Sequence, residues 1–217
     1  MGLRINDTIP NLTVATDQGT MQLHDWIGDS WAILFSHPKD FTPVCTTEFG
    51  AVAQLAEAWK ERGTKVMGIS VDSVEEHKKW KADIEVFAGA KAGFPIIADE
   101  DLKVAKAFDM LPADAYLPEG RTAADSETVR AVFIVGPDKK LKLSMTYPMN
   151  VGRNFAEVLR ALDALQTAAK ETIATPANWN VGDDVIIPTK VSNEDAKKKY
   201  GEFETVFPYL RRTKLPA

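Results

Sequence analysis

Apolar residues along this chain gather in short runs that alternate with longer amphipathic segments. Five runs are apolar or alternate with period two and end at turn residues, which is typical of strands; they are Trp31–Ser36, Lys65–Val71, Phe94–Ala98, Arg130–Val135 and Leu141–Tyr147. Four segments carry apolar residues at helical spacing; they are Thr46–Arg62, Val74–Phe87, Leu102–Phe108 and Phe155–Lys170. Strands that alternate with helices predict an α/β fold with a largely parallel core, closed by an antiparallel hairpin over residues 130–147.

The order of these elements is thioredoxin-like, and it ends near Lys170. Turn-forming residues then interrupt the periodicity from Ala174 to Asp184. A short strand at Val185–Pro188 and a charged helix at Asn193–Tyr200 follow. We predict a main domain over residues 1–170 and a small C-terminal domain over residues 171–217. A segment this short should lack a core of its own and pack on the main domain or on a second subunit.

Composition and charge narrow the classes of function. The formal charge is −5, from 26 basic and 31 acidic side chains, which disfavours binding to nucleic acid because phosphate neutralisation needs clustered cations. The N-terminus has polar residues and a proline where a secretory signal would be apolar. The apolar runs are too short to span a bilayer. These features predict a soluble cytoplasmic protein with no insertion into a membrane.

The chain has one cysteine, Cys45, which excludes an intrachain disulfide, a CxxC redox motif and a cysteine-rich metal site. It lies in the segment SHPKDFTPVCTTE, between a predicted strand and a predicted helix. Unpaired N–H groups at a helix N-terminus favour an anion, so the thiolate should be favoured there. Pro38 and Pro43 restrict the loop, and Thr42 supplies a hydroxyl three residues before the sulfur. The alternative is that Cys45 is a small buried hydrophobic residue.

The spacing Pro38-x-x-x-Thr42-x-x-Cys45 resembles the active-site signature of the peroxiredoxins, the AhpC/TSA family. The whole segment SHPKDFTPVCTTE is similar to that of their one-cysteine subfamily, as are the later segments RAVFIVGPDKKL, TYPMNVGRNF and ATPANW. The resemblance covers nearly the whole chain. It implies a thioredoxin-like fold and a thiol peroxidase without a cofactor, which reduces hydrogen peroxide and organic hydroperoxides. Cys45 would become a sulfenic acid and be restored by an external thiol.

The resemblance also implies roles for residues around the sulfur. Arg130 would lie near the thiolate and polarise the peroxide, and Thr42 would orient the peroxide by hydrogen bonding. The backbone N–H groups near Val44 and Cys45 would add donors, and Pro38 would shield the sulfur from water. The two side chains have structural alternatives: Arg130 could form a surface ion pair, and Thr42 could merely end a strand.

Three further residues are implied as supporting the site. Glu48 would hold Arg130 in place, although it could simply favour the first helical turn. Arg153 resembles a second arginine near the site in this family. His37 could hydrogen-bond near the sulfur or act as a base, but a histidine before a proline is often structural.

Other functions and partners follow from the same resemblance. Animal one-cysteine peroxiredoxins have a phospholipase A2 activity that is assigned to a serine, a histidine and an aspartate. The matching positions here hold Ser30, His24 and Asp138, but Ala32 replaces the second glycine of the G-x-S-x-G pattern. A peroxide sensor or a chaperone is a further alternative. A thiol-disulfide exchanger would need a second cysteine. The expected partners are a peroxide, an external thiol or protein reductant, and a second copy of the chain in a homodimer that could extend to a larger ring.

Overall fold

The computed structural model describes residues 2–215 and divides the chain into two compact units, Met1–Phe155 and Ala156–Ala217. The division falls earlier than the boundary predicted near Lys170. The helix that follows Phe155 accounts for the difference, because its contacts include the C-terminal segment. The Arg160 guanidinium, for example, donates to the carbonyl of Trp179 at 2.9 Å.

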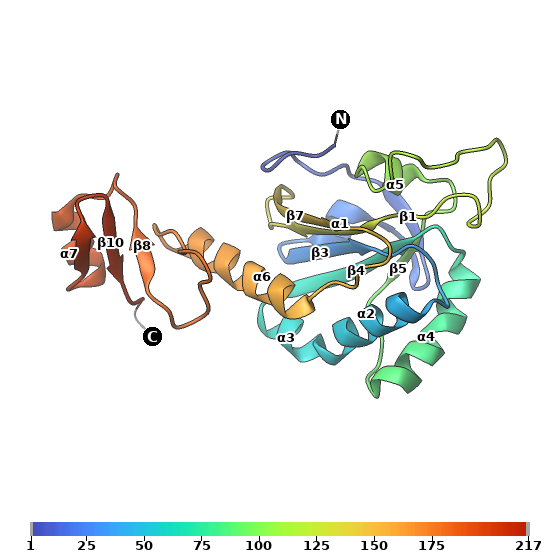
Figure 1. Cartoon of the computed structure of the whole chain (residues 1–217), viewed down its shortest axis with the longest axis horizontal. Coiled ribbons are helices and arrows are strands. Elements are labelled where there is room, and N and C mark those ends of the chain that lie inside the picture. The colour runs from blue at the N-terminus through green and yellow to red at the C-terminus, as the bar shows by residue number, and fades with distance from the viewer. Residues whose placement is uncertain (1, 216–217) are drawn as a thin grey trace. The chain divides into compact units, whose positions relative to one another are not determined.

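The first unit is built on a seven-stranded sheet in the order β2-β1-β5-β4-β3-β6-β7. Its strands are β1 (Thr13–Thr16), β2 (Gly19–Gln22), β3 (Trp31–Ser36), β4 (Thr64–Ser70), β5 (Ile96–Ala98), β6 (Arg130–Val135) and β7 (Leu141–Tyr147). Its helices are α1 (Leu23–Ile27), α2 (Pro43–Gln54), α3 (Ala56–Glu61), α4 (Val74–Ala88) and α5 (Lys103–Ala107). Strands β3, β4 and β5 are parallel, and β6 and β7 pair antiparallel, which confirms the predicted α/β, thioredoxin-like fold (Figure 1).

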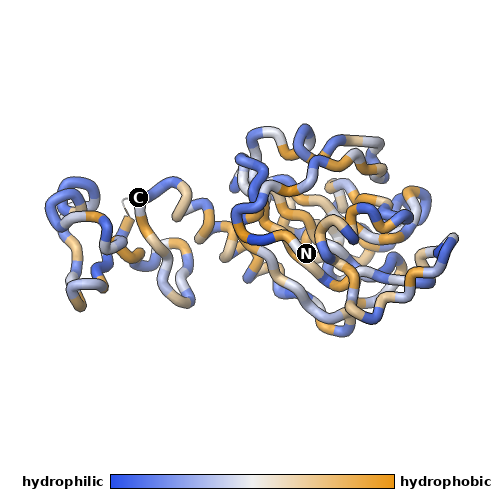
Figure 2. Tube along the Cα trace, turned by 90° about the horizontal axis from the view of Figure 1, so that it is seen from above, coloured by the Kyte–Doolittle hydropathy of each residue, from blue (hydrophilic) through white to orange (hydrophobic). Residues whose placement is uncertain are grey.

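Helices cover both faces of this sheet, as the nearly continuous apolar strands require. Alternate residues of a strand point to opposite faces. Leu34 of β3 joins the core cluster that includes residues of α1 and α5. Its neighbour Phe35 instead contacts the ring of Phe49 on α2, with the centroids 4.8 Å apart. Hydropathy along the trace shows the same arrangement, with apolar segments in the middle of this unit and polar ones at its periphery (Figure 2).

The observed elements differ from the predicted ones in three places. The long helix predicted over Thr46–Arg62 starts earlier, at Pro43, and is interrupted at Leu55 between α2 and α3. The pair β1 and β2 was not predicted, because these strands have four residues each and mostly exposed side chains. The five-residue helix α1 is likewise too short to show a period.

The C-terminal unit contains α6 (Phe155–Lys170, all but its first residue), β8 (Val185–Ile187), α7 (Asn193–Tyr200), β9 (Glu204–Phe207) and β10 (Leu210–Thr213). Its strands form an antiparallel sheet in the order β8-β10-β9. Contrary to expectation, this unit has a small hydrophobic cluster of its own, around Ile173, Trp179 and Val185. The cluster is completed by Ala164, so α6 supplies apolar surface that a segment beginning at residue 171 would lack.

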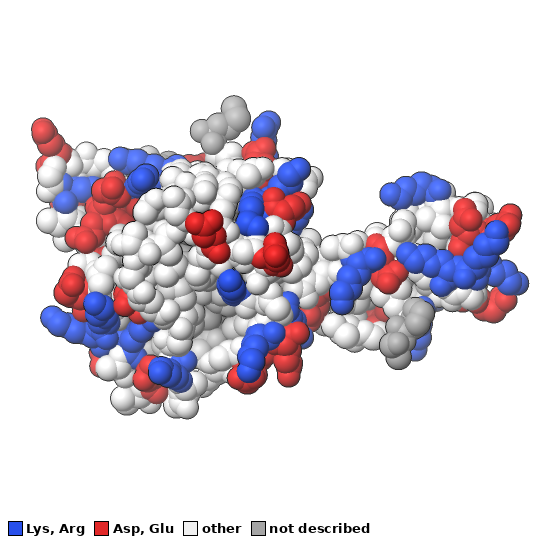
Figure 3. Space-filling model, turned by 180° about the vertical axis from the view of Figure 1, so that it is seen from behind, with Lys and Arg blue, Asp and Glu red and all other residues white. Residues whose placement is uncertain are grey.

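Within residues 2–215, none of the helices combines the length and apolar character needed to cross a bilayer. On the face shown in Figure 3, acidic and basic side chains are interspersed and leave large uncharged areas between them.

Gly68 of β4 allows the helix that carries Cys45 to pack closely on the sheet. A Cβ at this position would lie 2.8 Å from two ring atoms of Phe49, a separation that would force the ring or the helix to move. We therefore expect Gly68→Ala to lower the free energy of unfolding by about 1–3 kcal/mol, measured by urea denaturation. Gly93→Ala is the matched control, because no atom lies within 4 Å of its added Cβ. Equal unfolding midpoints for the two variants would contradict this packing.

Candidate active site

Cys45 lies in the first turn of α2, which begins where the loop after β3 ends. Thr42 is the N-cap residue with an extended backbone, and Pro43 occupies the first helical position, where its missing N–H costs nothing. The first backbone hydrogen bond of the helix runs from the N–H of Thr46 to the carbonyl of Thr42 at 3.0 Å. The N–H groups of Val44 and Cys45 precede it and stay available to an anion or a polarised oxygen.

The Cys45 side chain is completely buried and faces a cation. Nη1 of Arg130 lies 3.3 Å from the Cys45 sulfur. Arg130 is the first residue of β6, and its Nε donates to the carbonyl of Met149 at 2.7 Å, which fixes the direction of the guanidinium. The structure therefore brings together two residues 85 positions apart in the sequence, as the resemblance implied.

Glu48 lies one turn after Cys45 on the same helix and binds two arginines. Its Oε2 accepts hydrogen bonds from Nη1 of Arg130 and from Nη2 of Arg153, each at 2.7 Å. Its Oε1 accepts from the backbone N–H of Arg153 at 2.8 Å and from Nε of the same residue at 2.9 Å. Burial acts to raise the pKa of Glu48, but the hydrogen bonds and charge of Arg153, together with the charge of Arg130, hold that pKa below its usual range.

Arg153 is buried and connects Glu48 to the sheet. Its Nη1 donates to the carbonyl of Ala131 on β6 at 2.8 Å. The guanidinium also lies over the ring of Phe35, 5.3 Å from the centroid. Since Arg130 and Arg153 share one carboxylate, α2, β6 and the segment after β7 are joined beside the sulfur.

The loop residues predicted to contact a peroxide surround the start of α2. Thr42 is half-buried, and its hydroxyl donates to the carbonyl of Lys39 at 2.9 Å, which leaves the oxygen lone pairs for another donor. Pro38 is buried and Val44 half-buried. Phe41, immediately before Thr42, has a left-handed backbone with φ of 54°, an uncommon conformation for a bulky residue.

His37 makes its side-chain hydrogen bond away from the sulfur. Its Nε2 is paired with the Asp40 carboxylate at 2.6 Å, and its ring stacks on Trp80 with the centroids 4.9 Å apart. No hydrogen bond joins His37 to Cys45 in the described part of the chain. The structure thus pairs the His37 side chain with Asp40 and not, by a hydrogen bond, with the sulfur.

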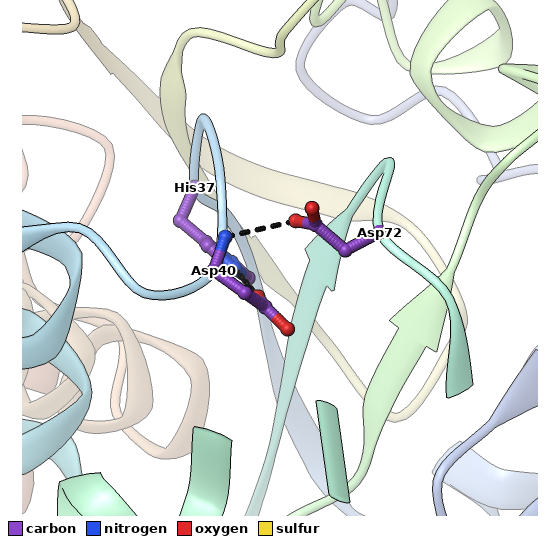
Figure 4. Close-up of side chains that lie close together, drawn as sticks. All are labelled: His37, Asp40 and Asp72. Carbon is purple, nitrogen blue, oxygen red and sulfur yellow. Dashed lines mark hydrogen bonds and ion pairs between the residues drawn. The ribbon is translucent and has the colours of Figure 1, made fainter. Parts of the chain in front are cut away.

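Sequence reasoning missed the buried network to which His37 belongs. Asp40 also pairs with Nδ1 of His77 at 2.6 Å. Figure 4 shows His37, Asp40 and Asp72, with the backbone N–H of Asp40 donating to Asp72 at 2.9 Å. A signal was present, since His77 falls on the apolar stripe of a predicted helix and a buried histidine needs polar partners.

Among residues 2–215, the group with metal-ligand geometry is His37, Asp40 and Asp72, whose ligand atoms lie within 4.8 Å of one another. Both side-chain oxygens of Asp40 already bind histidine nitrogens. Asp72 Oδ2 accepts from a backbone N–H and from the Ser70 hydroxyl. These contacts occupy both oxygens of Asp40 and one oxygen of Asp72, whereas Nδ1 of His37 has no hydrogen-bond partner among the described residues.

Comparison with known proteins agrees with this geometry. The chain matches the AhpC/TSA family over residues 5–144 and the C-terminal domain of 1-Cys peroxiredoxin over residues 164–202. The chain belongs to this peroxiredoxin family. It is 48% identical to 1-Cys peroxiredoxin PER1 of Triticum aestivum, with 99% of each chain covered.

Two solved structures are similar over almost the whole peroxiredoxin. A cysteine-to-serine mutant of Peroxiredoxin 6 of Arenicola marina superposes with a TM-score of 0.92 at 43% identity, covering 99% of both chains. The yeast mitochondrial 1-Cys peroxiredoxin, described for its thiol resolving mechanism via glutathione/thioredoxin systems, gives 0.90 at 48% identity and covers 98% of this chain and 100% of its own. The peroxiredoxin is accordingly an oxidoreductase, a thiol peroxidase of the one-cysteine class.

The residues considered for a lipase activity are not joined by hydrogen bonds in the described peroxiredoxin chain. Nε2 of His24 is paired with the carbonyl of Ile9 at 2.8 Å. The carboxylate of Asp138 is paired with Lys142 at 2.7 Å. Ser30 follows the turn after α1, where its backbone N–H donates to Ile27. The triad geometry that would activate this serine is absent from the described residues.

Replacing Glu48 by glutamine tests the shared carboxylate. Glu48→Gln keeps the shape but leaves two buried arginines without their anion, so we expect a loss of about 3–5 kcal/mol in the free energy of unfolding. Because the native pKa of Glu48 is depressed, its contribution is present at neutral pH and lost as the pH falls through that pKa, so the destabilisation should shrink in acid. Urea denaturation at several pH values measures both the loss of unfolding free energy and its decrease in acid. Glu57→Gln, in an exposed pair with Lys60, is the control. A pH-independent difference would contradict this role.

Proposed function

We propose that Cys45 is the nucleophile of a one-cysteine thiol peroxidase and that Arg130 supports it as the main electrostatic group. The observation that carries the proposal is the 3.3 Å contact between Nη1 of Arg130 and the buried sulfur. A guanidinium at this distance stabilises the thiolate and can donate to a peroxide oxygen bound beside it. Thr42 and the N–H groups of Val44 and Cys45 would bind the peroxide from the other side.

The chemical step breaks the O–O bond. The Cys45 thiolate attacks one oxygen of ROOH and forms an S–O bond, while the O–O electron pair leaves with the second oxygen. That oxygen takes a proton and departs as water or alcohol, and Cys45 becomes a sulfenic acid. Negative charge therefore moves from sulfur to the leaving oxygen, and a cation that contacts the sulfur can stabilise both ends of this path.

Resolution requires a thiol from outside the chain. A thiol attacks the sulfenic sulfur and releases water, and a second thiol then breaks the mixed disulfide and restores Cys45. We propose glutathione or a thioredoxin-type protein as the reductant, supported by the description of the yeast relative. A reducing thiol pool is needed for this cycle, and on that ground we propose the cytoplasm as its compartment.

We further propose a homodimer, able to assemble into larger rings. Outer strand β9 and the turn after it expose the apolar side chains of Val206, Phe207 and Tyr209. The rings of Phe207 and Tyr209 are stacked with centroids 5.4 Å apart. Exposed aromatic side chains at a sheet edge are typical of surfaces that pair with another chain.

Arg130→Met removes the cation and keeps much of the side-chain volume. We expect the second-order rate constant for Cys45 oxidation to fall by an amount equivalent to about 3 kcal/mol, as for loss of one oxyanion donor. Stopped-flow fluorescence with hydrogen peroxide measures it. Arg4→Met, on a side chain that is 75% exposed, is the matched control. An unchanged rate constant for Arg130→Met would remove this residue from the reaction.

The oxidation products of Cys45 test the one-cysteine cycle itself. Without reductant, we expect intact-mass analysis to show one added oxygen after one equivalent of peroxide, and two or three after excess, with activity lost in step. With a small thiol present, a mixed disulfide should form instead. Cys45→Ser should take up no oxygen and have no activity. Active disulfide-linked dimers as the main product would show that two subunits resolve each other and would overturn the proposal.

A further inference from the structure

Two buried histidines share one carboxylate behind the active site. His37, in the loop after β3, and His77, on α4, each lie 2.6 Å from a different oxygen of Asp40. Both imidazole rings are fully buried and Asp40 is 3% exposed, so bulk water cannot exchange for these contacts. The peroxidase chemistry described above uses neither His77 nor Asp40.

The partners of His77 define its charge. Its Nδ1 faces Asp40, and its Nε2 lies 3.1 Å from the carbonyl of Ile97, which can only accept a hydrogen bond. Burial acts to raise the pKa of Asp40, but hydrogen bonds from His37 and His77 lower that pKa to about 2, so the carboxylate also only accepts. Both ring nitrogens of His77 must therefore carry protons, and this residue is an imidazolium.

His37 has the opposite state. Its Nε2 donates to Asp40, whereas its Nδ1 is buried without a hydrogen-bond partner in the described chain. Burial lowers the pKa of His37, and the charge of His77 contributes in the same direction. A proton on Nδ1 would be a buried donor without an acceptor, so the nitrogen is bare and His37 is neutral. The imidazolium, carboxylate and neutral imidazole together have no net charge.

Besides Asp40, the carboxylates of Asp72 and Glu76 interact electrostatically with His77. Asp72 lies beyond Asp40, and Glu76 precedes His77 on α4 and caps that helix through Ser73. From β5 the contact is the carbonyl of Ile97. Deprotonation of His77 would remove the positive charge beside Asp40. The carboxylate of Asp40 would then lie near that of Asp72 without this charge to balance it.

The network is connected to the turn that carries Cys45. Asp40 precedes the N-cap residue Thr42 by two positions. The ring of His37 packs edge-on against Phe49 of α2, with the centroids 4.4 Å apart. Trp80, which stacks on His37, donates from its indole to the Thr46 hydroxyl at 3.1 Å.

We propose that His77 is a positioning residue of this peroxidase: as a buried imidazolium it balances Asp40, keeps His37 neutral, and fixes the loop that leads into Cys45. The consequence for the reaction rests on the proposed function of Cys45, whereas the charge assignment does not.

The charge states can be measured without activity. The chain has three histidines, so ring-nitrogen NMR spectra can be assigned with single variants. At neutral pH we expect His77 to show two protonated nitrogens and His37 one. In His77→Asn, which retains a neutral donor toward Asp40, the titration of His37 should move to higher pH. A bare nitrogen on His77 in the wild-type protein at neutral pH would overturn the proposal, even if the variant failed to fold.

The rate of Cys45 oxidation tests the positioning role. We expect His77→Asn to react several-fold more slowly with peroxide and to gain a pH dependence in the range where His37 titrates. Lys78→Asn, an exposed neighbour on the same helix, should match the wild type. An unchanged rate and pH profile in His77→Asn would show that the pair only supports the fold, and would overturn the positioning role. A wild-type Cys45 that did not react with peroxide would instead refute the proposed function and leave the NMR assignment standing.

Discussion

A single buried carboxylate, that of Glu48, holds the reactive sulfur and its cation in one geometry. Two buried guanidinium groups would repel each other without an anion between them, and one carboxylate can accept from both. Because Glu48 is on the helix of Cys45 and Arg130 begins β6, their ion pair sets the distance between sulfur and guanidinium. Arg153 extends the same contact to the carbonyl of Ala131, so the helix cannot shift along the sheet without breaking several hydrogen bonds. The remainder of the site is arranged around this junction.

Close packing between α2 and the sheet makes that junction possible. Cys45 and Phe49 are four residues apart and therefore share a face of the helix, and Phe49 sits over the glycine at position 68. A side chain there would force the Phe49 ring or the helix to move, and the same helix carries Cys45 and Glu48. The same ring contacts His37, so the aromatic layer that supports the helix also borders the buried charge network. The Phe49 ring thus links the packing of α2 on the sheet to the charged groups around His37.

The sequence predicts those parts of the molecule that repeat a local pattern. The central strands and α4 were predicted from apolar runs and helical spacing, and the position of Cys45 at a helix start followed from the helical periodicity that begins at Thr46. Arg130 is different, because no local pattern brings a residue 85 positions away to the sulfur, and only the resemblance to a family implied it. The pairing of His77 with Asp40 was not predicted, because Asp40 lies in an irregular loop. In such a loop, the spacing of residues in the sequence does not show where a side chain points.

Burial of Cys45 affects the two halves of the catalytic cycle in opposite ways. Hydrogen peroxide is close to water in size, and a brief local opening admits it to a site whose donors are already arranged. An external thiol is larger and must approach the sulfenic sulfur in line, which requires residues over Cys45 to move further. Every contact that holds α2 against Arg130 and the loop before Thr42 favours the first step and opposes this movement. With no second cysteine in the chain to trap the sulfenic acid, its lifetime depends on how often the site opens, so the rigidity that serves oxidation of the sulfur limits its reduction.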